Sequence, residues 1–256
     1  MKDRICIWCR QKQPIVTFLK VAHTIPQSLG GKEICFNVCD DCNHYFGSLH
    51  DDLPGIETVF KEVFYISRTI LLSSVGQIGK NKTQTHFKSI YFDGDLRKKT
   101  LKLKYTFRLN PTFQNKLCHQ FKRGILKVFL EETERQNQDG FDSKYDFIRD
   151  FARYNIGDYP VFYFPRKIGI LPYSIEDTKH PVLYFYNNMK YLIKDYNFFE
   201  FELLGHVFAI PTSREYMMNI DTYLKESMEL KNTFFHPPIE LIYLNQIDLA
   251  LNVMKD

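Results

Sequence analysis

The chain has 256 residues, a net charge of +4 at neutral pH, and 44% hydrophobic and 25% charged residues. These fractions are typical of globular proteins and exclude bulk disorder, low-complexity chains and collagen-like chains. The longest apolar stretch, residues 59–75, is interrupted by Lys61, Glu62, Ser67 and Arg68, so it falls short of the roughly 18 apolar residues of a membrane span.

The first four residues lead directly into a cysteine motif, without an apolar signal region. We therefore expect a cytoplasmic protein without a membrane partner. In that compartment clustered cysteines favour metal binding over disulfides.

A Cys-x-x-Cys motif occurs twice near the N-terminus, and 29 residues separate the two copies. Two such pairs can supply the four thiolates of a tetrahedral structural Zn²⁺ site; the alternative is four unrelated buried thiols. Cys35 lies outside the paired spacing and Cys118 is isolated in a helical pattern, so we expect both to be core thiols. The four paired cysteines are Cys6, Cys9, Cys39 and Cys42.

The segment between the two cysteine pairs has the punctuation of a hairpin with a long loop. Two short apolar runs, residues 15–25 and 34–38, are separated by the Gly30-Gly31 dipeptide. Asp40 and Asp41 follow the third cysteine, and acidic residues stabilise the first turn of a helix. The predicted order is therefore strand, loop, strand and helix, with one cysteine pair at each end.

The pattern CxxC, then H-x-I-P-x-S-L-G-G, then N-V-C-x-x-C-N-x-x-x-G is carried by residues 6–47. In order, spacing and residue types it resembles the HNH endonucleases, which have the ββα-metal or His-Me finger fold, in their four-cysteine zinc subclass. The resemblance implies a metal-dependent enzyme that hydrolyses phosphodiester bonds. It favours DNA as the partner, with RNA as an alternative, and a role in bacterial restriction or anti-phage defence.

The resemblance also implies a role for each matching residue. His23 corresponds to the general base that takes a proton from the attacking water. Asn37 corresponds to the residue that ties down the loop carrying this histidine. Asn43 corresponds to the ligand of a catalytic divalent ion, for which a carboxamide oxygen suits Mg²⁺ or Mn²⁺. The cysteines would hold the structural Zn²⁺ and fasten a finger too small to fold alone.

Ala22 is a departure from the family pattern, because an acidic metal ligand usually precedes the motif histidine. One interpretation is an active site that holds its ion through Asn43 and water. The other is a catalytically inactive nucleic-acid-binding or adaptor protein. We favour the active enzyme because the other motif residues are present. The candidates to replace the missing ligand are Asp40, Asp41 and His44.

A polar, turn-rich segment at residues 48–55 predicts a domain boundary. It would divide the chain into a zinc-bound finger, 1–54, and a larger α+β domain of unassigned fold, 55–256. A hairpin is predicted around Asp93-Gly94-Asp95. From hydrophobic periodicity, helices are predicted at 59–75, 116–136 and 143–154, and strands at 87–92, 101–107, 161–164, 182–186, 191–196, 199–210 and 239–244.

The charge is unevenly distributed. Residues 76–130 contain 13 basic and 2 acidic residues, a net charge of +11, so the rest of the chain carries −7. We expect this segment to contact phosphate groups rather than to be only a solvated face. Cleavage of both strands would need a second site, so a homo-oligomer or an activating partner is also considered. The expected nucleic-acid-binding residues are Lys98, Lys99, Lys102, Lys104, Lys116, Arg123 and Lys127.

Overall fold

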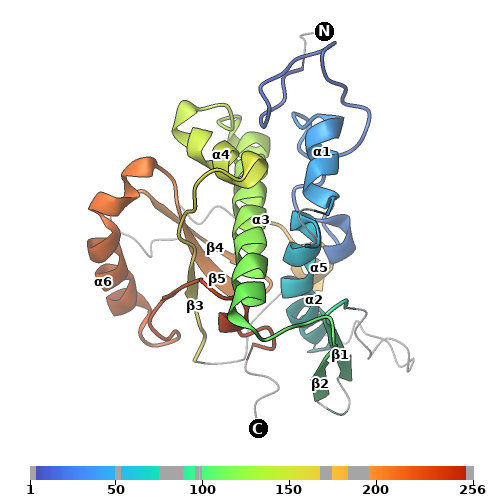
Figure 1. The fold of residues 1–256 in the computed structure, drawn as a ribbon. Helices are drawn as coiled ribbons and strands as arrows, with labels where there is room; N and C mark the ends of the chain where they lie inside the picture. Colours follow the sequence, from blue (N-terminus) through green and yellow to red (C-terminus); the bar gives the residue numbers. More distant parts are fainter. Residues whose placement is uncertain are drawn as a thin grey trace.

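A long helix, α3, runs through the middle of the molecule, with a four-stranded sheet on one side and α2 and the N-terminal unit (residues 4–49) on the other (Figure 1). The computed structural model describes residues 4–49, 53–74, 89–95, 98, 100–167, 175–183 and 196–251. The helices are α1 (Asp40–Gly47), α2 (Ile56–Ser74), α3 (Pro111–Asn137), α4 (Asp146–Tyr154), α5 (Ile175–Lys179) and α6 (Ile220–Lys231). The strands are β1 (Phe92–Asp95), β2 (Thr100–Leu103), β3 (Phe162–Phe164), β4 (Phe198–Leu203), β5 (His206–Pro211) and β6 (Ile239–Glu240). Helices combined with antiparallel sheets confirm the predicted α+β class.

Helix α3 begins earlier than the apolar periodicity predicts, because its start is fixed by a cap. The Asn110 side chain accepts a hydrogen bond from the backbone of Phe113, and Pro111 occupies the first helical position. Proline is favoured there because its missing N–H would have no helical partner. The helix ends where Gln138 adopts a left-handed conformation, with φ of 61°. Within the described residues no helix has both the length and the apolar character needed to cross a membrane.

Helix α2 packs against α3 through aromatic side chains. Phe60 and Phe64 of α2 contact Phe121 of α3, with ring centroids 6.1 and 5.8 Å apart. The helices come close because α3 has Gly124 at the crossing, where an added Cβ would lie 3.1 Å from the Phe60 ring. The predicted helix at 59–75 is thus confirmed, with its start at Ile56.

The larger sheet has the strand order β4-β5-β3-β6, and every neighbouring pair is antiparallel. Because side chains alternate between the faces of a strand, each face has its own apolar cluster. Toward α3, Phe208 and Phe199 contact Phe121 and Phe129. On the opposite face, Phe198 stacks on Tyr223 of α6, with ring centroids 4.2 Å apart. The sheet is therefore covered by helices on both sides (Figure 1).

The single strand predicted at 199–210 is wrong, because the structure has two strands joined by a tight turn. Leu204 and Gly205 form the turn, with φ of 48° and 86°. Positive φ at both central residues matches the twist of a two-residue hairpin. The apolar run continues through Leu204, which is buried, so hydrophobicity alone gave no sign of the break.

The small hairpin of β1 and β2 is present, but its turn was placed wrongly. Asp93, Gly94 and Asp95 lie inside β1 and pair with β2. The predicted strand at 239–244 is reduced to β6. Of the strand predicted at 182–186, residues 182–183 are not in a strand and residues 184–186 lie outside the described residues. Most of the strand predicted at 191–196 also lies outside them. The elements predicted at 143–154 and 161–164 are confirmed by α4, with a short 3-10 turn before it, and by β3.

The N-terminal unit has little regular structure. Its strand-like pairing is limited to isolated bridges, Ile5 with Lys12 and His23 with Ile34, and a 3-10 turn at Gln27–Leu29 comes before α1, which begins directly after Cys39. The order predicted from the sequence is recognisable, although the described strands are reduced to these bridges. Apolar side chains of this unit join the same buried cluster as α2 and α3. The domain boundary near residue 55 stays a prediction, and the buried core is continuous across it.

Candidate functional site

The four cysteines of the two predicted pairs come together at one end of the N-terminal unit. Their sulfur atoms all lie within 4.8 Å of one another, and the sulfurs of Cys9 and Cys39 are 3.8 Å apart. A Zn–S bond of about 2.3 Å in a tetrahedral site requires sulfurs roughly 3.8 Å apart. The geometry therefore fits one structural Zn²⁺.

Hydrogen-bond donors favour the thiolate form of Cys6, whereas burial raises the pKa of Cys39 to about 12 and the hydrogen bond to Cys6 raises the pKa of Cys42. A hydrogen bond from the Cys42 thiol, with smaller effects of backbone amides, lowers the pKa of Cys6 to about 5, although burial opposes this shift. The backbone amide of Cys39 lies 3.4 Å from the Cys6 sulfur, and the Arg153 guanidinium of α4 donates to Cys42 at the same distance. Arg153 also stacks over the ring of Tyr45, 3.8 Å from its centroid. Helix α4 is thus part of the surroundings of the cysteine cluster.

The two remaining cysteines behave as the spacing predicts. Cys35 and Cys118 are both buried and do not join the cluster. Burial raises the pKa of the Cys118 thiol to about 12, as expected for a thiol that stays protonated in an apolar core.

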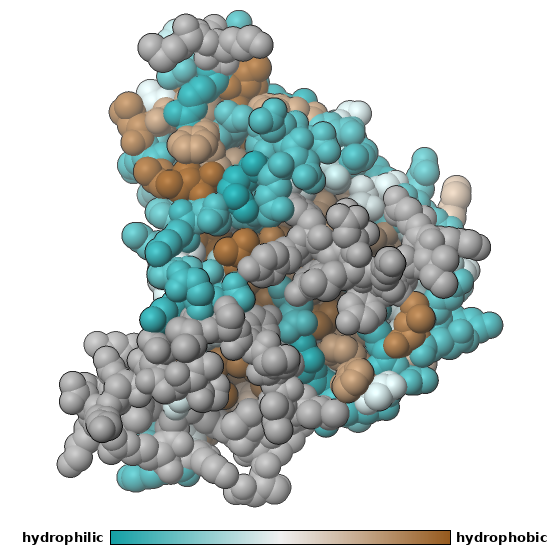
Figure 2. Space-filling view, turned by 180° about the vertical axis from the view of Figure 1, so that it is seen from behind, coloured by the Kyte–Doolittle hydropathy of each residue, from teal (hydrophilic) through white to brown (hydrophobic). Residues whose placement is uncertain are grey.

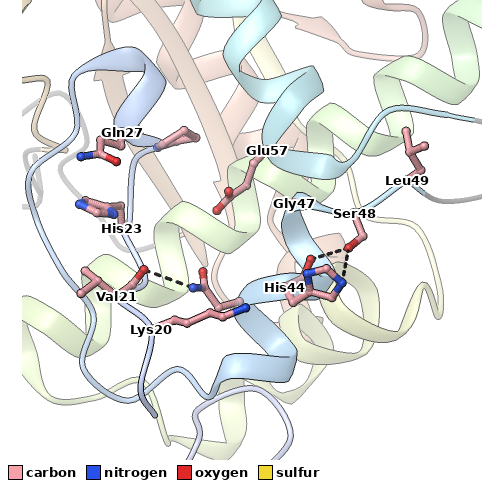
Figure 3. Close-up of a pocket in the computed structure, with 11 residues that line it drawn as sticks. Lys20, Val21, His23, Gln27, His44, Gly47, Ser48, Leu49 and Glu57 are labelled. Carbon is pink, nitrogen blue, oxygen red and sulfur yellow. Dashed lines mark hydrogen bonds between the residues drawn. The ribbon is translucent and has the colours of Figure 1, made fainter. Parts of the chain in front are cut away.

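His23 and Asn43 line the same pocket, a surface hollow of about 670 Å³. In Figure 3, Val21, His23 and Gln27 form one wall, while His44, Ser48 and Leu49 lie on the other. The amide nitrogen of Asn43 donates to the Val21 carbonyl at 3.2 Å. This hydrogen bond fixes the carboxamide plane and directs its oxygen, the atom that binds hard cations, away from that carbonyl. The first and last residues of the motif are thus brought together.

The backbone around His23 is fixed by a lysine from α3. The Lys127 ammonium donates to the carbonyls of His23 and Thr24, at 2.7 and 3.1 Å. The Thr24 hydroxyl in turn contacts the Glu132 carboxylate. Side chains from the middle of the chain therefore position the loop that carries the histidine.

Asn37 is placed differently from the role that the resemblance implied. Its amide nitrogen donates to Glu134 of α3 at 2.6 Å, and its backbone carbonyl accepts from Ile7. These contacts join Asn37 to α3 and to the first cysteine loop. Among the described residues, the side chain that holds the backbone of His23 is Lys127.

The structure also locates the residues considered in place of the missing acidic ligand. Ala22 is 1% exposed, and its carbonyl accepts a hydrogen bond from Cys35. Asp40 binds the Thr17 hydroxyl and the amides of Leu19 and Lys20. Both of its oxygens are therefore engaged by the loop at 17–20, and Asp40 itself does not line the pocket. Asp41 does not line the pocket, whereas His44 does.

Two of the residues expected to bind nucleic acid are inside the protein, so their assignment to that surface is wrong. Arg123 and Lys127 are each 2% exposed. Arg123 donates to the carbonyls of Phe151 and Ala152, capping α4, and Lys127 pairs with two carboxylates. Their helical spacing places them on the buried face of α3. They can lie there because a cation that is paired with carboxylates or carbonyls can be accommodated in a core.

The other expected contacts are distributed along the surface of the basic segment. Lys98, Lys102 and Lys116 are exposed. Lys104 is half-buried and donates to the Ser89 carbonyl, and Lys99 lies outside the described residues. On the face seen in Figure 2, apolar side chains gather on the N-terminal unit, at the upper left. The exposed large apolar residues of that unit are Ile5, Ile15, Leu19, Val21, Phe36 and Leu49.

Residues 6–53 match the family model of the HNH endonucleases. This match confirms the resemblance seen in the motif and covers the part of the chain that contains the cysteine cluster and the pocket. A search of curated proteins and a search of solved structures gave no match. Residues 6–53 are thus similar to an HNH endonuclease domain, and the rest of the chain has no match in these comparisons.

Proposed function

We propose that the protein is a metal-dependent endonuclease that hydrolyses phosphodiester bonds in DNA. The observation that carries this proposal is the shared pocket of His23 and Asn43, in which the Asn43 amide is already oriented. The pocket is open to the surface, so a nucleic-acid strand can reach it. Lys20 lies at its rim with an exposed side chain, where an ammonium suits a phosphate oxygen.

The chain's own residues supply base catalysis and positioning. The neutral imidazole of His23 accepts a proton from water, and the resulting hydroxide attacks phosphorus. The bond from phosphorus to the leaving oxygen breaks, and that oxygen takes a proton from solvent. Lys127 holds the backbone of His23 so that the imidazole faces the pocket. A divalent ion held through the Asn43 oxygen would stabilise negative charge on the phosphoryl and leaving oxygens.

The exposed lysines of the basic segment would hold the substrate through sequence-independent phosphate contacts. Lys98 lies between β1 and β2, Lys102 lies in β2, and Lys116 lies on α3. Phosphate contacts do not select a DNA sequence. The cleavage position would therefore be set by other contacts to the bases, by an activating partner or by a second copy of the chain. A nuclease of this type would suit restriction or anti-phage defence in bacteria.

Ala22 favours a second candidate, a nucleic-acid-binding protein without catalysis. An alanine cannot bind a cation, and this one is buried. The replacement Ala22→Asp would place a carboxylate in the interior and would cost stability, so restoring the family residue is a poor discriminator. The decisive comparison is therefore cleavage by the natural chain.

The test is nicking and linearisation of supercoiled plasmid at low salt with Mg²⁺, with Mn²⁺ and with EDTA. We expect cleavage that requires the divalent ion and is lost in His23→Ala and in Asn43→Ala. His119→Ala is the matched control, since His119 is a half-buried histidine of α3 outside the pocket. Cleavage that persists in His23→Ala would refute the general-base role. DNA binding without cleavage under all conditions would favour the second candidate.

A further inference from the structure

Glu57 lies in the first turn of α2 and is the only acidic residue among the described residues that line the pocket. Figure 3 shows its carboxylate pointing from the start of α2 into the space between His23 and His44. Its side chain is 26% exposed, so it is accessible from the pocket. No sequence pattern marks it, since it follows the motif in the chain and lies in a different element.

Lys127 fixes the position of this carboxylate. The ammonium of Lys127 contacts Oε1 of Glu57 at 2.8 Å and the His23 carbonyl at 2.7 Å. The Lys127 nitrogen thus holds both Oε1 of Glu57 and the carbonyl oxygen of His23. The distance between these two oxygens cannot exceed the sum of the two contact distances. A carboxylate has two oxygens, so an ion can bind through Oε2 while the ion pair remains.

The charges at the base of the pocket favour a cation. Lys127 is also paired with Glu131, at 2.9 Å, so one ammonium faces two carboxylates. Burial raises the pKa of Glu131 to about 7, and Lys127 opposes this shift. Glu57 is the more accessible of the two acids. When Glu131 is ionised, the group carries a net negative charge that a divalent ion would neutralise.

The family ligand missing at Ala22 leaves a need that Glu57 can meet. A divalent cation of the Mg²⁺ type is usually held by one or two carboxylates together with water. Asp40 is engaged elsewhere and Asp41 lies outside the pocket. Glu57 and Asn43 reach the same pocket from α2 and α1.

We propose that Glu57 is the carboxylate ligand of the catalytic divalent ion and replaces the acidic residue that the motif lacks. This inference rests on the proposed nuclease function. It places one ligand outside the residues matched by the family, on a helix that packs against α3. Ion binding would thereby depend on the docking of the N-terminal unit against α2 and α3.

The test is Mn²⁺ binding without nucleic acid. Binding is measured as the loss of the free Mn²⁺ signal in electron paramagnetic resonance. The full chain is used after its zinc content has been measured. We expect Glu57→Gln and Asn43→Ala each to weaken binding by roughly tenfold or more. Asp158→Asn is the matched control, because Asp158 also pairs with a buried lysine of α3, Lys122 at 2.5 Å, but lies outside the pocket. It should leave Mn²⁺ affinity unchanged.

The two proposals fail in different ways. Unchanged Mn²⁺ affinity in Glu57→Gln, or the lack of any Mn²⁺ site in the natural chain, would overturn the role of Glu57. Mn²⁺ binding that depends on Glu57, without plasmid cleavage, would support this ligand and count against the nuclease. If Glu57→Gln loses zinc or native fluorescence, anomalous diffraction from the natural protein with Mn²⁺ decides instead. A peak in contact with Glu57 supports the proposal, and a peak on Asn43 without Glu57 overturns it.

Discussion

The N-terminal unit and the helix-covered sheet are stabilised in different ways. The sheet side of the molecule buries aromatic side chains on both faces of β3, β4 and β5. The N-terminal unit has one eight-residue helix and isolated bridges, yet Trp8 and Phe46 are almost completely buried. It obtains this burial from four converging cysteines and from packing against α2 and α3, whose buried cluster its apolar side chains join. We therefore expect a unit with so little regular secondary structure to depend on a metal and on its neighbour for stability.

The largest expected effect comes from removing a zinc ligand. Cys39→Ser should release Zn²⁺ and unfold the N-terminal unit, because structural zinc supplies the folding free energy of such small units. The single tryptophan, Trp8, is buried in this unit, so its fluorescence should shift to longer wavelength. Far-ultraviolet circular dichroism should retain most of the signal of the helix-covered sheet.

Cys35→Ala is the matched control for that experiment, since Cys35 is a buried thiol of the same unit outside the cluster. It should keep one zinc per chain in elemental analysis. An unchanged zinc content in Cys39→Ser would refute the ligand set.

The link between the two regions is tested by Lys127→Met. This change leaves Glu131, which is 0% exposed, without its cation. Breaking a buried ion pair costs about 3–5 kcal/mol, so we expect a loss of this size in urea unfolding followed by Trp8 fluorescence. Lys122→Met is the control, because its partner Asp158 is 60% exposed and remains hydrated. Equal losses in the two variants would contradict a special role for Lys127.

The helix-covered sheet should show an acid sensitivity that depends on His206. Burial, with a smaller effect of the Arg166 charge, lowers the pKa of His206 to about 3. The unfolded chain binds this proton near pH 6.5, so the free energy of unfolding falls as the pH drops from about 6.5 toward 3. The expected contribution is about 2 kcal/mol at pH 5.

His206→Phe should remove this pH dependence, because phenylalanine does not bind a proton. The new ring should be accommodated, since Phe64, Tyr163 and Phe208 already surround the site. Urea unfolding at pH 7 and pH 5 measures the difference. His119→Gln, at a half-buried histidine of α3, should keep the dependence of the natural chain. A slope that His206→Phe leaves unchanged would assign the acid sensitivity to other groups.

The smallest effect on stability is expected at the exposed lysines. Lys102→Ala and Lys116→Ala should each change the free energy of unfolding by less than about 0.5 kcal/mol. Each should nevertheless weaken DNA binding and lower its salt dependence by about one ion. Lys225→Ala, at an exposed lysine of α6, is the control in fluorescence anisotropy at several salt concentrations. Equal losses in all three variants would contradict a basic surface confined to residues 76–130.

Local patterns predicted most helices and the cysteine cluster, but not the sheet turns. The helix at 116–136 was found because apolar periodicity records neighbours on one helix face. The turn after β4 was missed because Leu204 is apolar and buried although its backbone has the turn conformation. A hydrophobicity pattern reports burial, and at this position burial and strand geometry do not coincide.

The sequence by itself determined the zinc-ligand spacing, the HNH motif with His23 and Asn43, and the departure at Ala22. Only the tertiary structure decided that Lys127 is an interior group and that Glu57 faces the same pocket as His23. Lys127 is 104 residues from His23 in the chain and contacts its carbonyl directly. Contacts over such separations depend on how α2 and α3 pack against the N-terminal unit. Packing of this kind leaves no repeat or spacing in the sequence, because it joins segments whose local patterns are independent.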